Sequence, residues 1–191
     1  MTITISAVIL AGGKARRMEG RDKGLQMLKE KPLVQHVIER LQPQITDIAI
    51  NANRNQADYA KFGFLVFADE LPDFQGPLSG MLTALERAET DFVLFTPCDS
   101  PFFPQNLLEK FKSAVKNHRT FIAYACDTER EHPTFCLMSV KLKNKLRDYL
   151  ASGERRLLQF MCENSGVAVK FDENEGKFVN FNTLDDLNCT I

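Results

Sequence analysis

Residues 10–24 combine glycines and cations in a way that suits a polyphosphate ligand. The segment reads LAGGKARRMEGRDKG and follows the apolar run 3–9. Its four glycines let the backbone approach a ligand closely, and its five cations can compensate phosphate charge. Backbone N–H groups exposed in such a loop bind anions as well. The segment therefore predicts a loop that binds the phosphates of a nucleoside triphosphate, and a basic surface loop is the alternative.

Spacing excludes two common phosphate-binding motifs. A P-loop needs G-x-x-x-x-G-K-[ST], but the two Gly-Lys pairs of the chain, which begin at Gly13 and Gly176, continue with Ala15 and Phe178. The dinucleotide fingerprint G-x-G-x-x-G fails because Gly12 and Gly13 are adjacent. The loop therefore belongs to a different class of nucleotide-binding site.

A carboxylate follows a second apolar run. Residues 92–95 are all apolar, and the segment TPCDSP after them contains Asp99. Magnesium prefers oxygen ligands, and proteins often hold it with one or two carboxylates plus substrate phosphates. The pattern predicts Asp99 as a Mg²⁺ ligand. The alternative is that Asp99 caps the helix expected from Pro104.

Polar side chains follow two further apolar runs. Asn51 ends the run 47–51, and Asp69 comes shortly after the run 64–67. An asparagine offers both donors and acceptors to a base or ribose. A carboxylate can accept hydrogen bonds from a guanine edge or a ribose hydroxyl. The alternatives are a turn asparagine and a solvated loop acid.

Three other segments carry candidate binding residues. Gly76 and Gly80 flank the start of a predicted helix and could let a flat base lie against the backbone; packing against a neighbouring strand is the alternative. Arg155 and Arg156 could bind a second phosphate through their planar guanidinium groups, or could simply begin a solvated helix. The charged segment 127–133 is expected to form a turn or lip.

Composition limits the class of protein. The chain has 191 residues, a net charge of −1, 44% hydrophobic and 26% charged residues, which fits one soluble domain. A neutral chain has no overall basic surface for nucleic acid or an anionic membrane. No apolar run approaches the ~20 residues that span a bilayer. Five cysteines without a C-x-x-C pair, and no secretory leader, lead us to expect a reduced cytoplasmic protein.

The order of the predicted elements indicates an α/β fold. Strands are expected at 3–9, 47–51, 64–67 and 92–95, and helices at 32–41, 56–62, 77–87 and 104–116. The second half is less regular, with strands expected at 121–126, 134–138, 167–171 and 178–180 and helices at 140–150, 156–163 and 183–188. This alternation predicts a single domain with a mostly parallel, Rossmann-like sheet flanked by helices. We expect residues 1–118 to bind the nucleotide and residues 119–191 to bind the acceptor.

Several motifs together resemble a known family. The chain contains LAGGKARRM-x₄-KG after a strand, then NANR, GPLSGM, PCDSP, EREHPT, GERR and a late FVNFNT. The first of these is shared by many nucleotidyltransferases, including those that act on sugar phosphates. The complete set is similar to the molybdenum cofactor guanylyltransferases, and it runs from the first strand to Asn182.

The resemblance implies roles for particular residues. It implies a catalytic set of Arg17, Lys23 and Asp99, with Asp99 holding Mg²⁺. The residues that it places around GTP are Leu10, Ala11, Gly12, Gly13, Lys23, Asn51, Asp69, Gly76, Gly80 and Asp99. Those that it places around the acceptor are His132, Arg155, Arg156, Asn180 and Asn182.

The implied reaction transfers GMP from GTP to the terminal phosphate of molybdenum-molybdopterin and releases pyrophosphate. The attacking oxygen is already anionic, so no general base is needed, and the sequence offers no convincing one. A monomer is expected, with transient contacts to proteins that supply and accept the cofactor. One alternative is a nucleotidyltransferase that acts on a sugar phosphate or uses CTP. Another is a GTP-binding adaptor without turnover.

Overall fold

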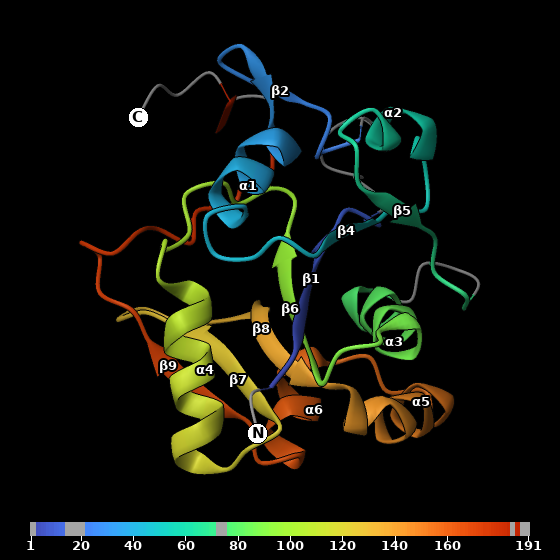
Figure 1. Ribbon diagram of the computed structural model, residues 1–191, viewed down its shortest axis with the longest axis vertical. Helices are drawn as coiled ribbons and strands as arrows, with labels where there is room; N and C mark the ends of the chain where they lie inside the picture. The colour runs from blue at the N-terminus through green and yellow to red at the C-terminus, as the bar shows by residue number, and fades with distance from the viewer. Residues whose placement is uncertain (1–2, 14–21, 72–75, 184–185, 188–191) are drawn as a thin grey trace.

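A seven-stranded sheet forms the centre of the molecule (Figure 1). The computed structural model describes residues 3–13, 22–71, 76–183 and 186–187. The strands of the sheet, in spatial order, are β5 (Leu65–Phe67), β4 (Ile48–Asn51), β1 (Ile5–Leu10), β6 (Phe92–Pro97), β8 (Glu131–Ser139), β7 (Ile122–Cys126) and β9 (Val167–Lys170). The first four run parallel, β8 is antiparallel to both of its neighbours, and β9 is parallel to β7.

Helices cover both faces of the sheet. They are α1 (Leu33–Leu41), α2 (Gln56–Ala60), α3 (Pro77–Arg87), α4 (Leu107–His118), α5 (Lys143–Ala151) and α6 (Leu157–Glu163), with a 3₁₀ turn at Val140–Leu142. Helices α1 and α4 share one apolar cluster, and α3, α5 and α6 share another. Among the helices of the described residues, none is long and apolar enough to cross a membrane.

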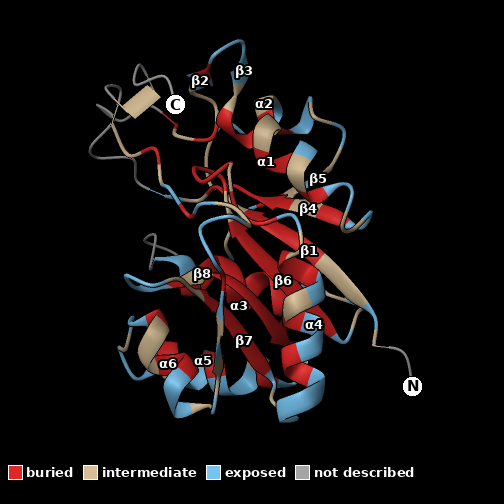
Figure 2. Ribbon diagram, turned by 90° about the vertical axis from the view of Figure 1, so that its left-hand side faces the viewer, coloured by how far each residue is buried: buried red, intermediate tan, exposed pale blue. Residues whose placement is uncertain are grey.

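Strand β1 shows why the predicted strands read as continuous apolar runs. Its Ala7 and Ile9 belong to the cluster of α1 and α4, whereas Val8 belongs to the cluster of α3. Successive side chains of a strand point to opposite faces, so a strand covered on both sides is apolar at nearly every position. Figure 2 shows these central strands buried between the helices. The prediction of a mostly parallel α/β sheet is confirmed.

Two predictions in the second half were wrong. Residues 178–180, which the structure describes in full, form no strand. The ring of Phe178 instead packs against those of Phe135 and Phe171. The charged segment 127–133 is only partly a turn, because β8 already begins at Glu131.

One element was not predicted, the short hairpin of β2 (Met27–Leu28) and β3 (Lys31–Pro32). The helix expected at 183–188 falls partly outside the described residues.

Strand β8 takes a detour where it leaves its regular pairing with β7. Tyr124 pairs with Cys136 and the next residue, Ala125, pairs with His132, so three residues of β8 lie between the two pairs. Such bulges re-aim side chains and are common beside active sites. Thr134 lies within the detour and His132 directly before it, and the two residues line different cavities, which are described below.

Candidate active site

The carboxyl ends of four parallel strands place polar groups at one edge of the sheet. Asn51 is the last residue of β4, and the loops after β1, β5 and β6 carry Gly12, Asp69 and Asp99, respectively. In open α/β sheets, ligands bind outside these ends. A cavity of about 300 Å³ lies there. The residues that line it are Leu10, Gly12, Gly13, Asn51, Asp69, Gly76, Pro77, Pro97, Asp99 and Thr134.

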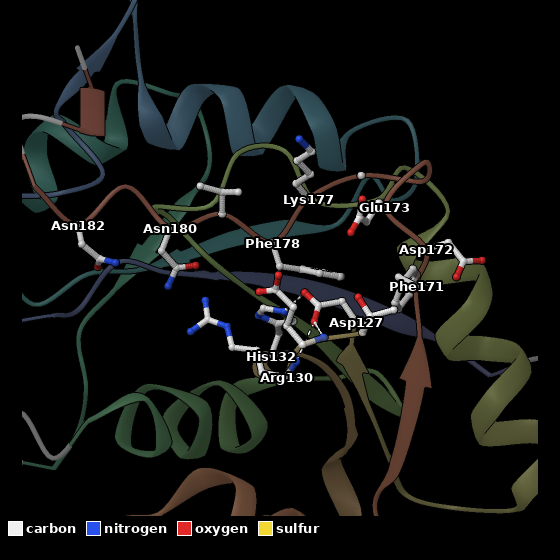
Figure 3. Close-up of a pocket in the computed structure, with 14 residues that line it drawn as sticks. Asp127, Arg130, His132, Phe171, Asp172, Glu173, Lys177, Phe178, Asn180 and Asn182 are labelled. Carbon is white, nitrogen blue, oxygen red and sulfur yellow. Dashed lines mark hydrogen bonds and ion pairs between the residues drawn. The ribbon is translucent and has the colours of Figure 1, made fainter. Parts of the chain in front are cut away.

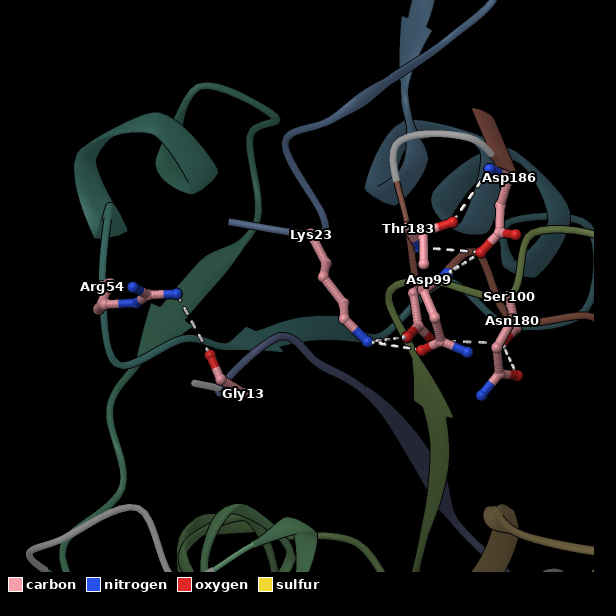
Figure 4. A network of polar contacts seen from close by, with 9 residues as sticks. Gly13, Lys23, Arg54, Asp99, Ser100, Asn180, Thr183 and Asp186 are labelled. Atoms are coloured by element: carbon pink, nitrogen blue, oxygen red, sulfur yellow. Dashed lines mark hydrogen bonds and ion pairs between the residues drawn. The ribbon is translucent and has the colours of Figure 1, made fainter. Parts of the chain in front are cut away.

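Lys23 and Asp99 form an ion pair at this cavity, although 76 residues separate them. The Lys23 Nζ lies 3.2 Å from Asp99 Oδ2 and donates a second hydrogen bond, of 2.7 Å, to Asn182 Oδ1. Asp99 is only 9% exposed. Figure 4 shows the lysine reaching across to the carboxylate. The structure thus brings together a cation and an anion that the sequence analysis assigned to phosphates and to Mg²⁺.

Asn51 and Asp69 also form a pair. The Asn51 side chain is buried, and its Nδ2 donates to Asp69 Oδ1 at 2.8 Å. The main-chain N–H of Asp69 donates to Asn53 Oδ1 at 2.8 Å. A Cβ on Gly80 would lie 2.2 Å from Asn51 Oδ1. Gly80 therefore has a packing role, since any side chain there would displace the Asn51 amide.

A second cavity, of about 430 Å³, lies on the side of the C-terminal half (Figure 3). Its lining includes His132, whose Nε2 lies 2.6 Å from Asp127 Oδ2 and whose ring stacks on Phe178 at 4.6 Å. Asn180 and Asn182 line the same cavity. The other residues around it are Thr128, Glu129, Arg130, Phe171, Asp172, Glu173, Gly176, Lys177 and Val179.

The Asp127 carboxylate is the charged partner in its hydrogen bond with His132. Burial raises the pKa of Asp127, but hydrogen bonds from the Arg130 N–H, the His132 ring and the Glu129 N–H outweigh it and bring the pKa to about 2. Asp127 is therefore ionised at neutral pH and fixes the orientation of the imidazole.

Residues 171–182 form a strap that joins the two cavities. Its main chain donates from Phe181 N to Asp99 O at 2.9 Å. Its Asn180 accepts a hydrogen bond of 2.6 Å from the Ser100 hydroxyl, and its Asn182 accepts the one from Lys23. The strap thus places two residues of the larger cavity next to the ion pair of the smaller one.

Glu175 anchors this strap to α4. Its carboxylate accepts hydrogen bonds from Asn106 Nδ2 at 2.7 Å and Lys110 Nζ at 2.9 Å, and from the main-chain N–H of Asp172 at 2.8 Å. The Asp172 N–H, then Asn106 and Lys110, lower the pKa of Glu175 from 4.5 to about 2. A carboxylate with a depressed pKa stabilises the fold above its unfolded pKa, and this stabilisation is lost as pH falls through the folded value.

Glu175→Gln is therefore expected to lower the free energy of unfolding near neutral pH. The difference from the wild type should shrink as pH falls from about 4.5 to about 2. Urea denaturation across this range measures it, with the exposed Glu173→Gln as the control. An equal difference at every pH would show that Glu175 acts through packing rather than through its charge.

Some of the predicted site residues line neither cavity. Arg155 and Arg156 line neither of them. The guanidinium of Arg155 donates to Leu150 O at 2.8 Å and to Glu154 O at 2.6 Å, so it caps the end of α5. Arg17 lies outside the described residues.

Other residues line the cavities without having been predicted as site residues: Pro97 lines the smaller cavity and Phe178 the larger one. Of the EREHPT motif, Arg130 lines the larger cavity and Thr134 the smaller one. Asn53 links two loops, because its Nδ2 donates to Gly12 O at 3.4 Å and its Oδ1 binds Asp69 N. Two of these residues had a signal in the sequence: Asn53 is the second asparagine of NANR, and Phe178 is the first residue of FVNFNT.

Known proteins share this fold and sequence. A model of the MobA-like NTP transferase domain matches residues 7–167. A molybdenum cofactor guanylyltransferase from Haemophilus influenzae Rd is 76% identical over 191 residues, which cover all of both chains. One from Histophilus somni 129Pt is 61% identical over 187 residues, 98% of this chain and 96% of its own.

Solved structures agree in fold. Molybdopterin-guanine dinucleotide biosynthesis protein A from Archaeoglobus fulgidus superposes with a TM-score of 0.79 at 21% identity, covering 96% of this chain and 95% of its own. A CMP:2-keto-3-deoxy-manno-octonic acid synthetase complexed with CTP reaches 0.75 at 12% identity, covering 97% and 95%. The fold is therefore that of nucleotidyltransferases, and the match to the family model together with the sequence relatives shows that this chain belongs to the MobA-like molybdenum cofactor guanylyltransferases.

Proposed function

We propose that this chain transfers GMP from GTP to the terminal phosphate of molybdenum-molybdopterin in a Mg²⁺-dependent reaction. The observation that carries the proposal is the contact between the two cavities. Asp99 of the smaller cavity and Asn182 of the larger one both bind the Nζ of Lys23. A single cation is thus shared by two adjoining binding sites, as the joining of two anionic substrates requires. The names of the sequence relatives support the identity of the substrates.

GTP is assigned to the cavity at the sheet edge. Gly12 and Gly13 lie there at the end of β1, where main-chain N–H groups can meet phosphates. The Asn51–Asp69 pair lies in the same cavity and offers a carboxylate to the base or ribose. A volume of about 300 Å³ is at the lower end of the range for small-molecule sites.

The acceptor is assigned to the larger cavity, which residues 127–182 build. Lys177 and Arg130 offer positive charge to the phosphate of the acceptor, and the stacked His132–Phe178 pair offers a flat surface to a ring. Arg155 and Arg156 remain candidates for this role only if they exchange the contacts that they make around the end of α5. Contacts with proteins that deliver and accept the cofactor are part of the same proposal.

The proposed reaction moves no proton at the start. An oxygen of the acceptor phosphate forms a bond to the α-phosphorus of GTP, and the bond from that phosphorus to the bridging oxygen of the β-phosphate breaks. Pyrophosphate leaves with the electron pair. Lys23 compensates the charge that accumulates on the phosphates, and Asn182 and Asp99 hold its ammonium group in place.

The residues present fit a magnesium ion. Asp99 is a nearly buried carboxylate that faces the cavity assigned to the triphosphate. Mg²⁺ is commonly held by one or two carboxylates together with substrate phosphates and water. Within the described residues no cluster of three His, Cys, Asp or Glu side chains forms an all-protein site, so the other ligands would come from the substrate. When bound, the ion would neutralise phosphate charge as a Lewis acid.

Incubation with GTP, Mg²⁺ and molybdenum-molybdopterin tests the proposal directly. Mass spectrometry is expected to detect the guanine dinucleotide, together with one pyrophosphate for each product. GTP binding without formation of product would favour the alternative of a GTP-binding adaptor without turnover. Thermal-shift measurements with GTP, CTP, UTP and ATP give the base preference, because a ligand that binds only the native state raises its stability. Strongest stabilisation by CTP or UTP would favour a different nucleotidyltransferase.

Asp69→Asn is expected to weaken the preference for GTP over ATP. The substitution keeps the shape of the side chain but replaces one of its two accepting oxygens by an NH₂ donor, so it can no longer accept with both atoms. Losing one such interaction with a base costs about 1–3 kcal/mol of discrimination, by analogy with base readout in nucleic acids. The ratio of the two dissociation constants measures it, and Glu89→Gln serves as a control outside the cavity. An unaltered ratio would assign Asp69 to the ribose or to structure.

A further inference from the structure

Asp22, the residue before Lys23, is a buried acid that the proposed reaction does not use. It is 8% exposed. Its Oδ1 accepts a hydrogen bond of 2.5 Å from the Tyr59 hydroxyl, and its Oδ2 accepts one of 3.1 Å from Asn55 Nδ2. Both partners come from α2 or the residue before it. An acid that precedes the catalytic lysine is thus fastened to a different part of the chain.

The residue after Lys23 is held by the same tyrosine. Tyr59 is fully buried. A Cβ built on Gly24 would lie 2.4 Å from the Tyr59 hydroxyl and 3.2 Å from Cys98 Sγ. The backbone at Gly24 therefore passes directly over the phenol, which explains why this position needs a glycine.

Gln26, which directly precedes β2, and Val34 of α1 also bind the main chain of this segment. Gln26 Nε2 donates to Asp22 O at 2.7 Å, and Val34 N donates to Gly24 O at 2.9 Å. The main chain is thus fixed immediately before and after Lys23. A lysine has four flexible side-chain bonds, so the placement of its ammonium group depends on how well its main chain is held.

We propose that Tyr59 is a positioning residue, which holds the main chain at Lys23 through its hydrogen bond to Asp22 and so keeps the ammonium group between Asp99 and Asn182. Tyr59 itself lines neither cavity. Its effect on the reaction must therefore pass through Lys23. A kinetic test of this inference rests on the proposed function, whereas a test by chemical labelling of Lys23 does not.

The state of the phenol suits this role. Burial, then the neighbouring Cys98 and Asp22, raise the pKa of Tyr59 far above its usual range. The hydroxyl therefore stays protonated and donates to the carboxylate at any pH at which the protein is folded. The contact is a constant structural bond rather than a switch.

The kinetic test is a double-mutant cycle. Tyr59→Phe removes one hydroxyl and keeps the ring, and it is expected to lower kcat for guanylyl transfer about tenfold with the KM for GTP changed less than about twofold. In the background of Lys23→Ala the same substitution should cause no further loss of kcat. Tyr124→Phe, at another buried tyrosine outside both cavities, is the matched control. An equal loss with and without Lys23 would show a general structural effect and overturn the proposal.

The chemical test needs no turnover. The rate at which an amine-reactive ester labels Lys23, measured by mass spectrometry, reports how firmly the ammonium group is held. We expect Tyr59→Phe to label Lys23 several-fold faster than the wild type, with labelling of the exposed Lys61 unchanged. An unchanged rate at Lys23 would overturn the proposal. If the wild type makes no guanine dinucleotide, the proposed function fails while this measurement still decides the role of Tyr59.

Exchanging the acid and the amide at positions 22 and 55 distinguishes loss of this contact from a general loss of stability. Asp22→Asn places an amide against the Asn55 amide and should accelerate labelling of Lys23. Adding Asn55→Asp restores a donor and an acceptor with the positions exchanged, and it should return the labelling rate to near the wild-type value. Asn55 has a left-handed conformation with φ of 50°, which aspartate also tolerates. A lack of rescue in a double variant with the wild-type Tm would show that anchoring residue 22 to the α2 segment does not hold Lys23, and it would overturn the proposal.

Discussion

Replacing Asp99 by alanine is expected to abolish Mg²⁺-dependent formation of the guanine dinucleotide, with a loss of turnover of roughly 10³-fold or more. The substitution removes the carboxylate that we assign to the metal and leaves Lys23 without its anionic partner. The fold should persist, because the main-chain hydrogen bond from Phe181 N to Asp99 O does not depend on the side chain. Turnover at several Mg²⁺ concentrations measures the effect, together with a thermal unfolding curve.

Asp99→Asn sharpens this test, because it keeps the shape of the side chain and removes only the charge. It should lose nearly as much activity as the alanine variant and should not recover at high Mg²⁺. Asp148→Ala, at an exposed position on α5, controls for the loss of any acid. Turnover near that of the wild type in either Asp99 variant would remove Asp99 from the mechanism.

Lys23→Ala is expected to lower kcat by about 10²–10³, which corresponds to about 2.7–4 kcal/mol in the transition state. Binding of GTP should weaken much less, because the charge on the phosphates rises as pyrophosphate leaves and the cation contributes most at that stage. Single-turnover rates and the dissociation constant of GTP separate the two effects. Lys61→Ala, at an exposed ion pair, is the control.

Two outcomes would count against this role for Lys23. A turnover number equal to that of the wild type would make it an ordinary cation near the site. A loss confined to GTP affinity would make it a ground-state binding residue, since uniform binding changes KM without changing kcat. The predicted pattern is a large effect on kcat and a small one on binding.

The half of the sheet to which we assign the nucleotide could be predicted because its strands are covered on both faces. Burial on both sides leaves a continuous apolar run, and a single polar residue after each run then marks the carboxyl end of the strand. Asp99 and Asn51 were found in this way. Helix α3 was predicted with the bounds that it has, Pro77–Arg87, because a proline marks its start and an apolar stripe marks its length.

The remaining features depend on contacts between distant parts of the chain. Glu131 and His132 look like turn residues, yet they pair with Cys126 and Ala125, and His132 is buried against Phe178. Nothing in the local pattern shows that partner. Residues 178–180 were predicted as a strand, but they pair with no neighbouring strand among the described residues, and the Phe178 ring packs against other rings instead.

The Tyr59–Asp22 bond is a further case, because 37 residues separate its partners. An acid inside a basic loop was the only hint that the sequence offered. Spacing rules describe neighbours along a helix or strand, and they carry no information about a pair that meets through the fold.

The detour in β8 has a consequence for the spacing of the two cavities. His132 lines the larger cavity, Thr134 lines the smaller one, and the strand on which both lie is hydrogen-bonded to β6 and β7. Removing one residue between His132 and Cys136 would turn the imidazole to the opposite face of the sheet, because side chains alternate along a strand. The number of residues in this short stretch therefore acts as a molecular spacer. It sets the spacing between the two cavities to which we assign the substrates.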